Sequence, residues 1–199
     1  MRTDLTFEID ASRQTFIDEL GIYSNAERST KYIRIEGLSG LGKTRLVYEA
    51  VKRNSLGYAT FYAQSPQDIP NNWFTYISQN PNDTKIILIV DETTYDETIE
   101  LLQKARRCKG RVLCITIGTD MPQHTGMVEA GVYSYGIKQL DNSSIQRILE
   151  DRTPTLSWEI HQHIIRLSNG RIKLALAAVE ALEQHQNSIS STSELMQAH

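Results

Sequence analysis

The sequence predicts an α/β protein: a five-stranded parallel sheet between two layers of helices, followed by a small helical lid. Two continuous aliphatic runs, within residues 85–92 and 111–117, are typical of strands buried on both faces of a parallel sheet. Three further strand patterns alternate with helical patterns, as in right-handed βαβ units, and lie at residues 32–36, 57–63 and 131–140. After residue 140 only helical patterns occur, which indicates a separate helical subdomain.

The helices follow from apolar periodicity and from end signals. A capping box from Thr94 to Glu97, for example, predicts the start of a helix there. We divide the chain into a core of residues 1–140, a lid of residues 141–187 and a polar tail or linker of residues 188–199. The expected helices are residues 11–20, 43–53, 71–80, 95–107, 141–151, 154–168 and 170–185.

Composition narrows the class of protein. The 199 residues are 40% hydrophobic and carry a net charge of −3, which suits one full core and argues against nucleic acid as a partner of the bulk surface. The cysteines, Cys108 and Cys114, have the spacing of neither a CxxC pair nor a disulfide framework, and this suits a reducing compartment. No apolar signal core and no membrane-spanning run is evident, so we expect a cytoplasmic protein without a membrane partner.

The stretch GLSGLGKTR fits the pattern G-x-x-x-x-G-K-[ST] and stands between a predicted strand and a predicted helix. Glycines allow a tight turn whose N–H groups point inward, and the helix start adds a positive dipole end. The lysine of such a loop reaches the β- and γ-phosphates of a nucleotide. The alternative is a glycine turn that carries a surface lysine. The residues expected to hold the nucleotide are Gly37, Leu38, Ser39, Gly40, Leu41, Gly42, Lys43, Thr44 and Arg45.

Asp91 and Glu92 end an aliphatic run in the manner of a Walker B strand. Asp91 and the Thr44 hydroxyl are expected to ligate Mg²⁺. Glu92 is expected to be the catalytic base that polarises an attacking water, and the alternative is a surface carboxylate at a strand end. One strand is expected in sequence between the loop and this motif, which marks ATPases with an additional strand and a catalytic glutamate. No N/T-K-x-D stretch for guanine occurs, so the expected cofactors are ATP or ADP and Mg²⁺.

With these motifs, the chain resembles the STAND class of signalling P-loop NTPases, relatives of AAA+ proteins. The resemblance covers GLSGLGKTRL, IILIVDE, the N-terminal segment FEIDASRQTFIDEL and the segment LSNGRIKLALAAVEAL. It implies that Arg171 contacts the γ-phosphate from the lid as a sensor 2 arginine, against the alternative of a solvated helix arginine. It also implies that Arg13 covers the adenine, against an exposed helix arginine, and that Thr119 occupies the sensor 1 position, where STAND proteins often have an arginine.

We therefore expect an ATP-binding, Mg²⁺-dependent, slowly hydrolysing switch domain of a larger signalling or bacterial defence protein. Its expected partners are the nucleotide, fused or associated sensor and effector domains, and a further copy of itself in a nucleotide-dependent oligomer. The alternatives are an AAA+-like, DNA-associated ATPase module and a non-hydrolysing assembly module. A basic run at residues 104–111 fits a helix C-terminus, an arginine finger or a phosphate contact. Trp73 and Trp158 are expected in the core.

Overall fold

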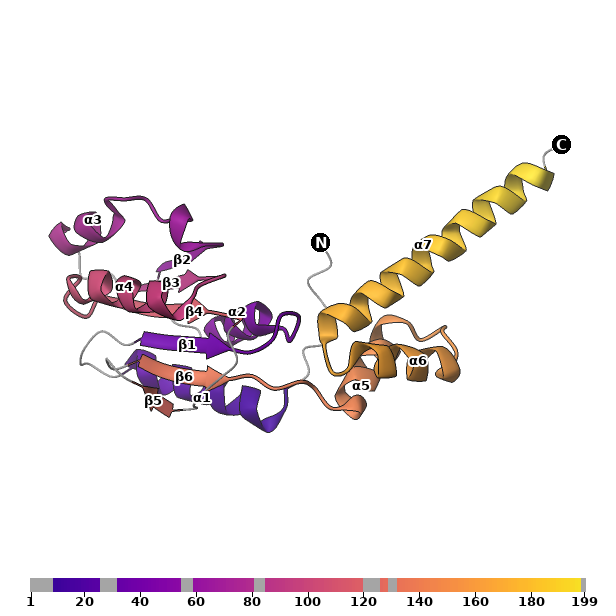
Figure 1. The fold of residues 1–199 in the computed structure, drawn as a ribbon, viewed down its shortest axis with the longest axis horizontal. Helices are drawn as coiled ribbons and strands as arrows, with labels where there is room; N and C mark the ends of the chain where they lie inside the picture. Colours follow the sequence, from indigo (N-terminus) through magenta and orange to yellow (C-terminus); the bar gives the residue numbers. More distant parts are fainter. Residues whose placement is uncertain are drawn as a thin grey trace. The chain divides into compact units, whose positions relative to one another are not determined.

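The computed structural model describes residues 9–25, 32–54, 59–80, 85–119, 126–128 and 132–197. Its chain forms two compact units. The core unit contains the described parts of residues 9–39 and 43–138. The helical unit contains residues 139–197 together with residues 40–42. Figure 1 shows the elements of both units, which are described separately below.

The core unit is built on a six-stranded sheet in the order β2-β3-β4-β1-β6-β5 (Figure 1). The first five of these strands run parallel, and β5 pairs antiparallel with β6 at one edge. The fold class is therefore confirmed, with one short edge strand added. The strands are β1 (Tyr32–Glu36), β2 (Ala59–Ala63), β3 (Ile86–Val90), β4 (Val112–Ile117), β5 (Gly126–Val128) and β6 (Val132–Gly136).

The sheet order confirms the additional strand. β2 lies between β1 and β3 in sequence, whereas β4 lies between them in space and pairs with both. The strand that precedes the glycine loop is thus two strands away from the strand that ends at Asp91. Because parallel strands all end at the same edge of a sheet, both motifs reach one edge together.

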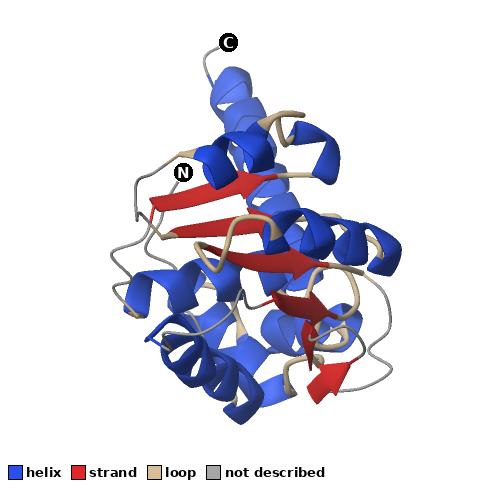
Figure 2. Cartoon of the chain, turned by 90° about the vertical axis from the view of Figure 1, so that its left-hand side faces the viewer, coloured by secondary structure: helices blue, strands red, loops and turns tan. Residues whose placement is uncertain are grey.

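Each face of the sheet is covered by helices. One face packs against α3 (Trp73–Gln79) and α4 (Tyr95–Arg106), seen over the strands in Figure 2, through a core that includes Phe74, Leu88 and Leu102. On the other face, the Phe16 ring of α1 (Ala11–Asn25) meets Tyr135 of β6 edge to face, and α1 also packs on α2 (Lys43–Arg53). A one-turn 3-10 helix, η1 (Pro66–Asp68), precedes α3.

The helical unit has its own apolar core. Leu149, Ile164 and Val179 are among its buried members, contributed by α5 (Asn142–Arg152), α6 (Trp158–Ser168) and α7 (Ile172–Gln197). Helix α7 continues through Gln197, into the segment expected to be a polar tail or linker. That segment contains no glycine or proline to end the helix after His185.

Other expectations about burial met different outcomes. Both cysteines are free and buried, as expected for Cys114. Trp73 packs against the core. Trp158, however, is 63% exposed, because it occupies the first turn of α6 after the N-cap Ser157. Among the described residues, the structure contains no helix of the length and apolarity that a membrane crossing requires.

Candidate nucleotide-binding site

The glycine loop connects the end of β1 to the start of α2. Strand β1 ends at Glu36 and the helix begins at Lys43, as the motif requires. Gly40 and Gly42 have φ angles of 86° and 85°, in the left-handed region that side chains other than glycine rarely enter. The observed backbone therefore explains the glycines at these positions, and Thr44 stands in the first turn of the helix that follows.

Lys43 points back into its own loop. Its Nζ donates to the carbonyl oxygens of Gly37 at 2.8 Å and Leu38 at 2.9 Å, and the residue is only 7% exposed. Burial lowers the pKa of Lys43, and the nearby Asp91 carboxylate opposes that shift. Two neutral carbonyl oxygens thus bind the ammonium. An anionic phosphate is a stronger acceptor and can replace them.

Thr44 and Asp91, the two predicted Mg²⁺ ligands, are in contact. The Thr44 hydroxyl donates to Asp91 Oδ2 at 2.6 Å, across 47 residues of sequence. A hydroxyl and a carboxylate are oxygen ligands of the kind that Mg²⁺ prefers, together with phosphate oxygens and water. The donor set therefore fits this cation beside a nucleotide.

Tyr62 is a member of this cluster that the sequence analysis missed. It stands near the end of β2, and its hydroxyl donates to the same Asp91 Oδ2 at 3.3 Å. Burial and the Asp91 charge raise the pKa of Tyr62. The available signal was positional. Tyr62 is the second-to-last residue of the strand predicted at residues 57–63, and parallel strands end at the edge of the sheet where Asp91 was expected.

Glu92 lies directly after Asp91 with an exposed side chain. Its φ of 49° is unusual for a residue other than glycine, and its N–H donates to Asp91 Oδ1 at 2.9 Å. Strained backbone of this kind is concentrated at functional sites. An exposed carboxylate at this edge has the placement that a base for an attacking water needs, and the role itself stays a prediction.

Thr119 follows β4 and is exposed at the same edge of the sheet as Glu92. Gly118, the residue before it, donates its N–H to the carbonyl of Ile35 in β1. The structure thus brings together the ends of β1, β3 and β4, with the residues expected at the loop, the Walker B strand and the sensor 1 position.

Arg13 is buried, which contradicts one of its two alternatives. It is 1% exposed, so it is not a solvent-exposed helix arginine. Its guanidinium pairs with Asp10 and donates to the carbonyl oxygen of Lys138 at 3.2 Å. Burial lowers the pKa of Arg13, and the Asp10 carboxylate partly offsets this effect. These contacts tie the start of α1 to the segment after β6, and a contact with adenine stays a prediction.

Arg45 and Arg171 have partly buried side chains in different units. Arg45 pairs with Glu49 at 2.6 Å and lies over the Tyr48 ring, so its guanidinium is engaged on the surface of α2. Arg171 follows the turn at Gly170, and its buried Nε has no hydrogen-bond partner in the part of the chain that the structure describes. The expected contact between Arg171 and the γ-phosphate stays a prediction.

The basic run at residues 104–111 serves a structural purpose at its end. Arg111 donates to the carbonyl oxygens of Asn80, at 2.7 Å, and of Ile77. These carbonyls belong to the C-terminal end of α3, where a cation is favourable. Arg106 and Arg107 are exposed.

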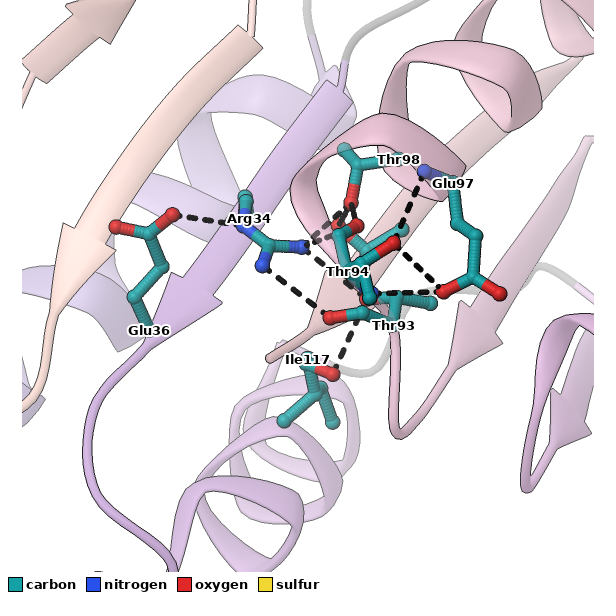
Figure 3. A network of polar contacts seen from close by, with 8 residues as sticks. Arg34, Glu36, Thr93, Thr94, Glu97, Thr98 and Ile117 are labelled. Carbon is teal, nitrogen blue, oxygen red and sulfur yellow. Dashed lines mark hydrogen bonds and ion pairs between the residues drawn. The ribbon is translucent and has the colours of Figure 1, made fainter. Parts of the chain in front are cut away.

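A second feature that the sequence analysis missed is Arg34 of β1. Its side chain is fully buried and lies among polar groups from β1, β3–α4 and β4 (Figure 3). The available signal was a pair of opposite charges, Arg34 and Glu36, two residues apart in a strand pattern, since charged residues require partners when they are buried.

Comparison with known proteins shows which fold the chain shares. No protein-family model matches the sequence, and no curated protein matches it. Among solved structures, AMPPCP-bound DnaA from Aquifex aeolicus matches with a TM-score of 0.61 and 16% identity over 96% of this chain and 69% of that one. The chain has a P-loop NTPase fold. RuvB, the Holliday junction branch migration motor of Thermotoga maritima, matches with a TM-score of 0.63 and 11% identity over 92% of this chain and 64% of its own.

Orc1 of Aeropyrum pernix, solved in complex with DNA, has a TM-score of 0.67 and 15% identity over 98% of this chain and 68% of that one. The chain thus spans about two thirds of these longer structures, and 91% of domain III of Thermotoga maritima DnaA. Because structures in complex with DNA are among the matches, the comparisons do not support our expectation that nucleic acid is not a partner.

Proposed function

We propose that this protein is an ATP-binding, Mg²⁺-dependent and slowly hydrolysing nucleotide switch. The observation that carries the proposal is the cluster of Lys43, Thr44 and Asp91 at the end of a parallel sheet, with Thr44 Oγ1 and Asp91 Oδ2 2.6 Å apart. A buried ammonium, a hydroxyl and a carboxylate are the groups that hold the phosphates and the cation of a nucleoside triphosphate. The sheet order, with its added strand between β1 and β3, supports ATP over GTP as the nucleotide.

In this proposal, the loop N–H groups and Lys43 bind the β- and γ-phosphates. Thr44 and Asp91 hold Mg²⁺, which neutralises phosphate charge. Glu92 accepts a proton from the attacking water while the bond from the water oxygen to the γ-phosphorus forms and the bond to the bridging oxygen breaks. The products are ADP and phosphate. Arg171 in the helical unit contacts the γ-phosphate, so that loss of this group changes the state of the switch.

The STAND-like segments extend the proposal to a signalling role within a larger protein, with sensor and effector partners and a nucleotide-dependent oligomer. This part rests on resemblance in sequence. The absence of an arginine at Thr119, the expected sensor 1 position, is the reason that we propose slow turnover.

Steady-state ATP hydrolysis by the wild-type chain and by Glu92→Gln tests the proposal. We expect slow, Mg²⁺-dependent phosphate release from the wild type and at least a hundredfold less from Glu92→Gln, since general base catalysis contributes roughly a hundred- to ten-thousandfold. ATP affinity should be retained by Glu92→Gln. Equal background rates in both proteins would remove the hydrolytic switch and leave a binding module.

The second candidate is a DNA-associated ATPase module. It is favoured by one finding, the match to Orc1 and ORC structures solved with DNA. It requires DNA-stimulated ATP hydrolysis that weakens steeply as salt rises, because phosphate contacts release counterions. Turnover that is unchanged by duplex and single-stranded DNA at low salt would eliminate it.

A further inference from the structure

Arg34 lies in the middle of β1, three residues before the glycine loop, and is fully buried. Its Nε donates to Glu36 Oε1 at 2.7 Å. Its Nη1 donates to Thr98 Oγ1 at 2.5 Å and to Thr93 Oγ1 at 3.2 Å. Further bonds of 3.2 Å reach the carbonyl oxygens of Thr93 and Thr94. One side chain therefore contacts the strand before the loop and the segment directly after Glu92.

The guanidinium reaches that segment by crossing β4, which lies between β1 and β3 in the sheet. Arg34 is paired in register with Thr116 of β4, and the next residue on the same face is Gly118. A Cβ atom at Gly118 would lie 2.2 Å from Arg34 Nη2 and 2.8 Å from the Thr93 carbonyl oxygen. The space that a side chain at Gly118 would fill is therefore occupied by the Arg34 fork.

The segment after Glu92 is also fixed to β4 directly. The Thr93 N–H and hydroxyl both donate to the Ile117 carbonyl oxygen, at 3.0 and 3.1 Å. Thr98 Oγ1 lies 3.1 Å from Thr116 Oγ1. Arg34 and these threonines thus join the three strand ends at which the loop, Glu92 and Thr119 stand. A lysine could not replace Arg34, since an ammonium lacks the planar fork that reaches several acceptors at once.

We propose that Arg34 is a positioning residue for hydrolysis. Its side chain is fully buried, and it holds the backbone at Thr93 and Thr94 through their carbonyl oxygens so that Glu92, at a φ of 49°, presents its carboxylate at the sheet edge. The Arg34 fork also fills the space beside Gly118, the residue before Thr119. The proposal rests on the proposed function, because it assigns Arg34 a role in presenting the base of that reaction.

Thr98→Val tests the proposal while leaving the buried charge in place, because it removes only the hydroxyl at 2.5 Å from Arg34 Nη1. Thr153→Val in the helical unit is a matched control. Both threonines are buried and lie close to the carbonyl oxygen four residues earlier, at 3.0 Å for Thr98 and 2.8 Å for Thr153. Thr98→Ser, which restores the hydroxyl, is the conservative rescue.

We expect Thr98→Val to lower kcat by roughly ten- to a hundredfold with little change in ATP affinity, as for a misplaced catalytic group. Amide hydrogen exchange should become faster at residues 92–94 and 118–119 and stay unchanged in α2. Thr153→Val and Thr98→Ser should behave like the wild type in both measurements. Wild-type turnover and exchange in Thr98→Val, or equal loss of turnover in Thr98→Val and Thr153→Val, would overturn the proposal.

Gly118→Ala provides a second variant if Thr98→Val does not fold. It removes no hydrogen-bonding group of the network, and its added methyl group displaces the Arg34 fork. We expect the same loss of kcat and the same faster exchange at residues 92–94, and unchanged values would overturn the proposal. If the wild type binds ATP without hydrolysing it, the hydrolytic part of the proposed function fails. Exchange at residues 92–94 then decides the role of Arg34 alone: faster exchange in the variants supports it and unchanged exchange refutes it.

Discussion

Arg34→Met removes the buried cation of β1 and keeps an unbranched side chain in its place. The Glu36 carboxylate, whose Oε1 accepts from Arg34 Nε at 2.7 Å, then loses this partner while its side chain remains 9% exposed. Thr93, Thr94 and Thr98 lose a donor as well. The substitution therefore leaves a carboxylate and several oxygen acceptors in a site with little access to water.

Breaking a buried ion pair from one side costs about 3–5 kcal/mol of stability. For a chain of this size each kcal/mol shifts the melting temperature by about 2–4 °C, so we expect a decrease of about 6–20 °C. Adding Glu36→Gln removes the uncompensated charge. The double variant should therefore be more stable than Arg34→Met alone, although the polar acceptors of the threonines still lack their donor.

Urea unfolding followed by tryptophan fluorescence measures these free energies for the core unit. Trp73 packs against the core of that unit, whereas Trp158 belongs to the helical unit and is exposed. All variants are therefore prepared in a Trp158→Phe background, so that Trp73 alone reports. Arg34→Met within about 0.5 kcal/mol of its parent, the range of a neutral surface substitution, would refute the reasoning. If the double variant is no more stable than Arg34→Met, the uncompensated charge of Glu36 is not the cause of the lost stability.

Three further outcomes are expected. Asp91→Asn should raise the Mg²⁺ concentration for half-maximal ATP binding by at least about tenfold in a calorimetric titration, because it removes the ligand charge beside Thr44; an unchanged Mg²⁺ dependence would exclude Asp91 as a ligand. Burial raises the pKa of Cys114 to about 12, so a thiolate-directed reagent at pH 8 should label it on the order of a thousandfold more slowly in the folded protein than in the unfolded chain. Because the unfolded thiol ionises first, the Cys114 contribution to the free energy of unfolding is present below about pH 8.5 and falls toward pH 12; equal labelling rates in the two states would contradict the burial. Gly170→Ala should destabilise the helical unit by about 1–3 kcal/mol, since Gly170 has a φ of 71° and a Cβ there would lie 2.5 Å from the Leu140 carbonyl oxygen; an unchanged melting curve by circular dichroism would contradict it.

The sequence predicted those parts of the fold whose signals are local. The aliphatic runs gave β3 and β4, and the capping box at Thr94 is present with Glu97 as its partner. The glycine loop lies between β1 and α2, as predicted. Its position was predictable because the glycine spacing of the motif requires one backbone conformation. The ends of the three central strands could be brought to one edge by the parallel order alone.

The parts that could not be predicted depend on contacts between distant segments. Strand β5 has three residues, too few for a recognisable alternation, and forms by pairing with β6. Helix α7 continues past His185 without an apolar pattern, since nothing in its sequence stops it. The one-dimensional pattern does not show which distant groups contact Arg13 and Arg34. Their burial follows from partners 125 and up to 64 residues away.

The central claim is that the loop built around Lys43 binds the triphosphate of ATP. Isothermal titration calorimetry of ATP with Mg²⁺ into the wild type and into Lys43→Ala, each shown to be folded by circular dichroism, tests it most directly. We predict measurable ATP binding by the wild type and at least a hundredfold weaker binding by Lys43→Ala, because two charge-assisted contacts of about 1.5–3 kcal/mol each are lost. Unchanged ATP affinity in a folded Lys43→Ala protein would contradict the account.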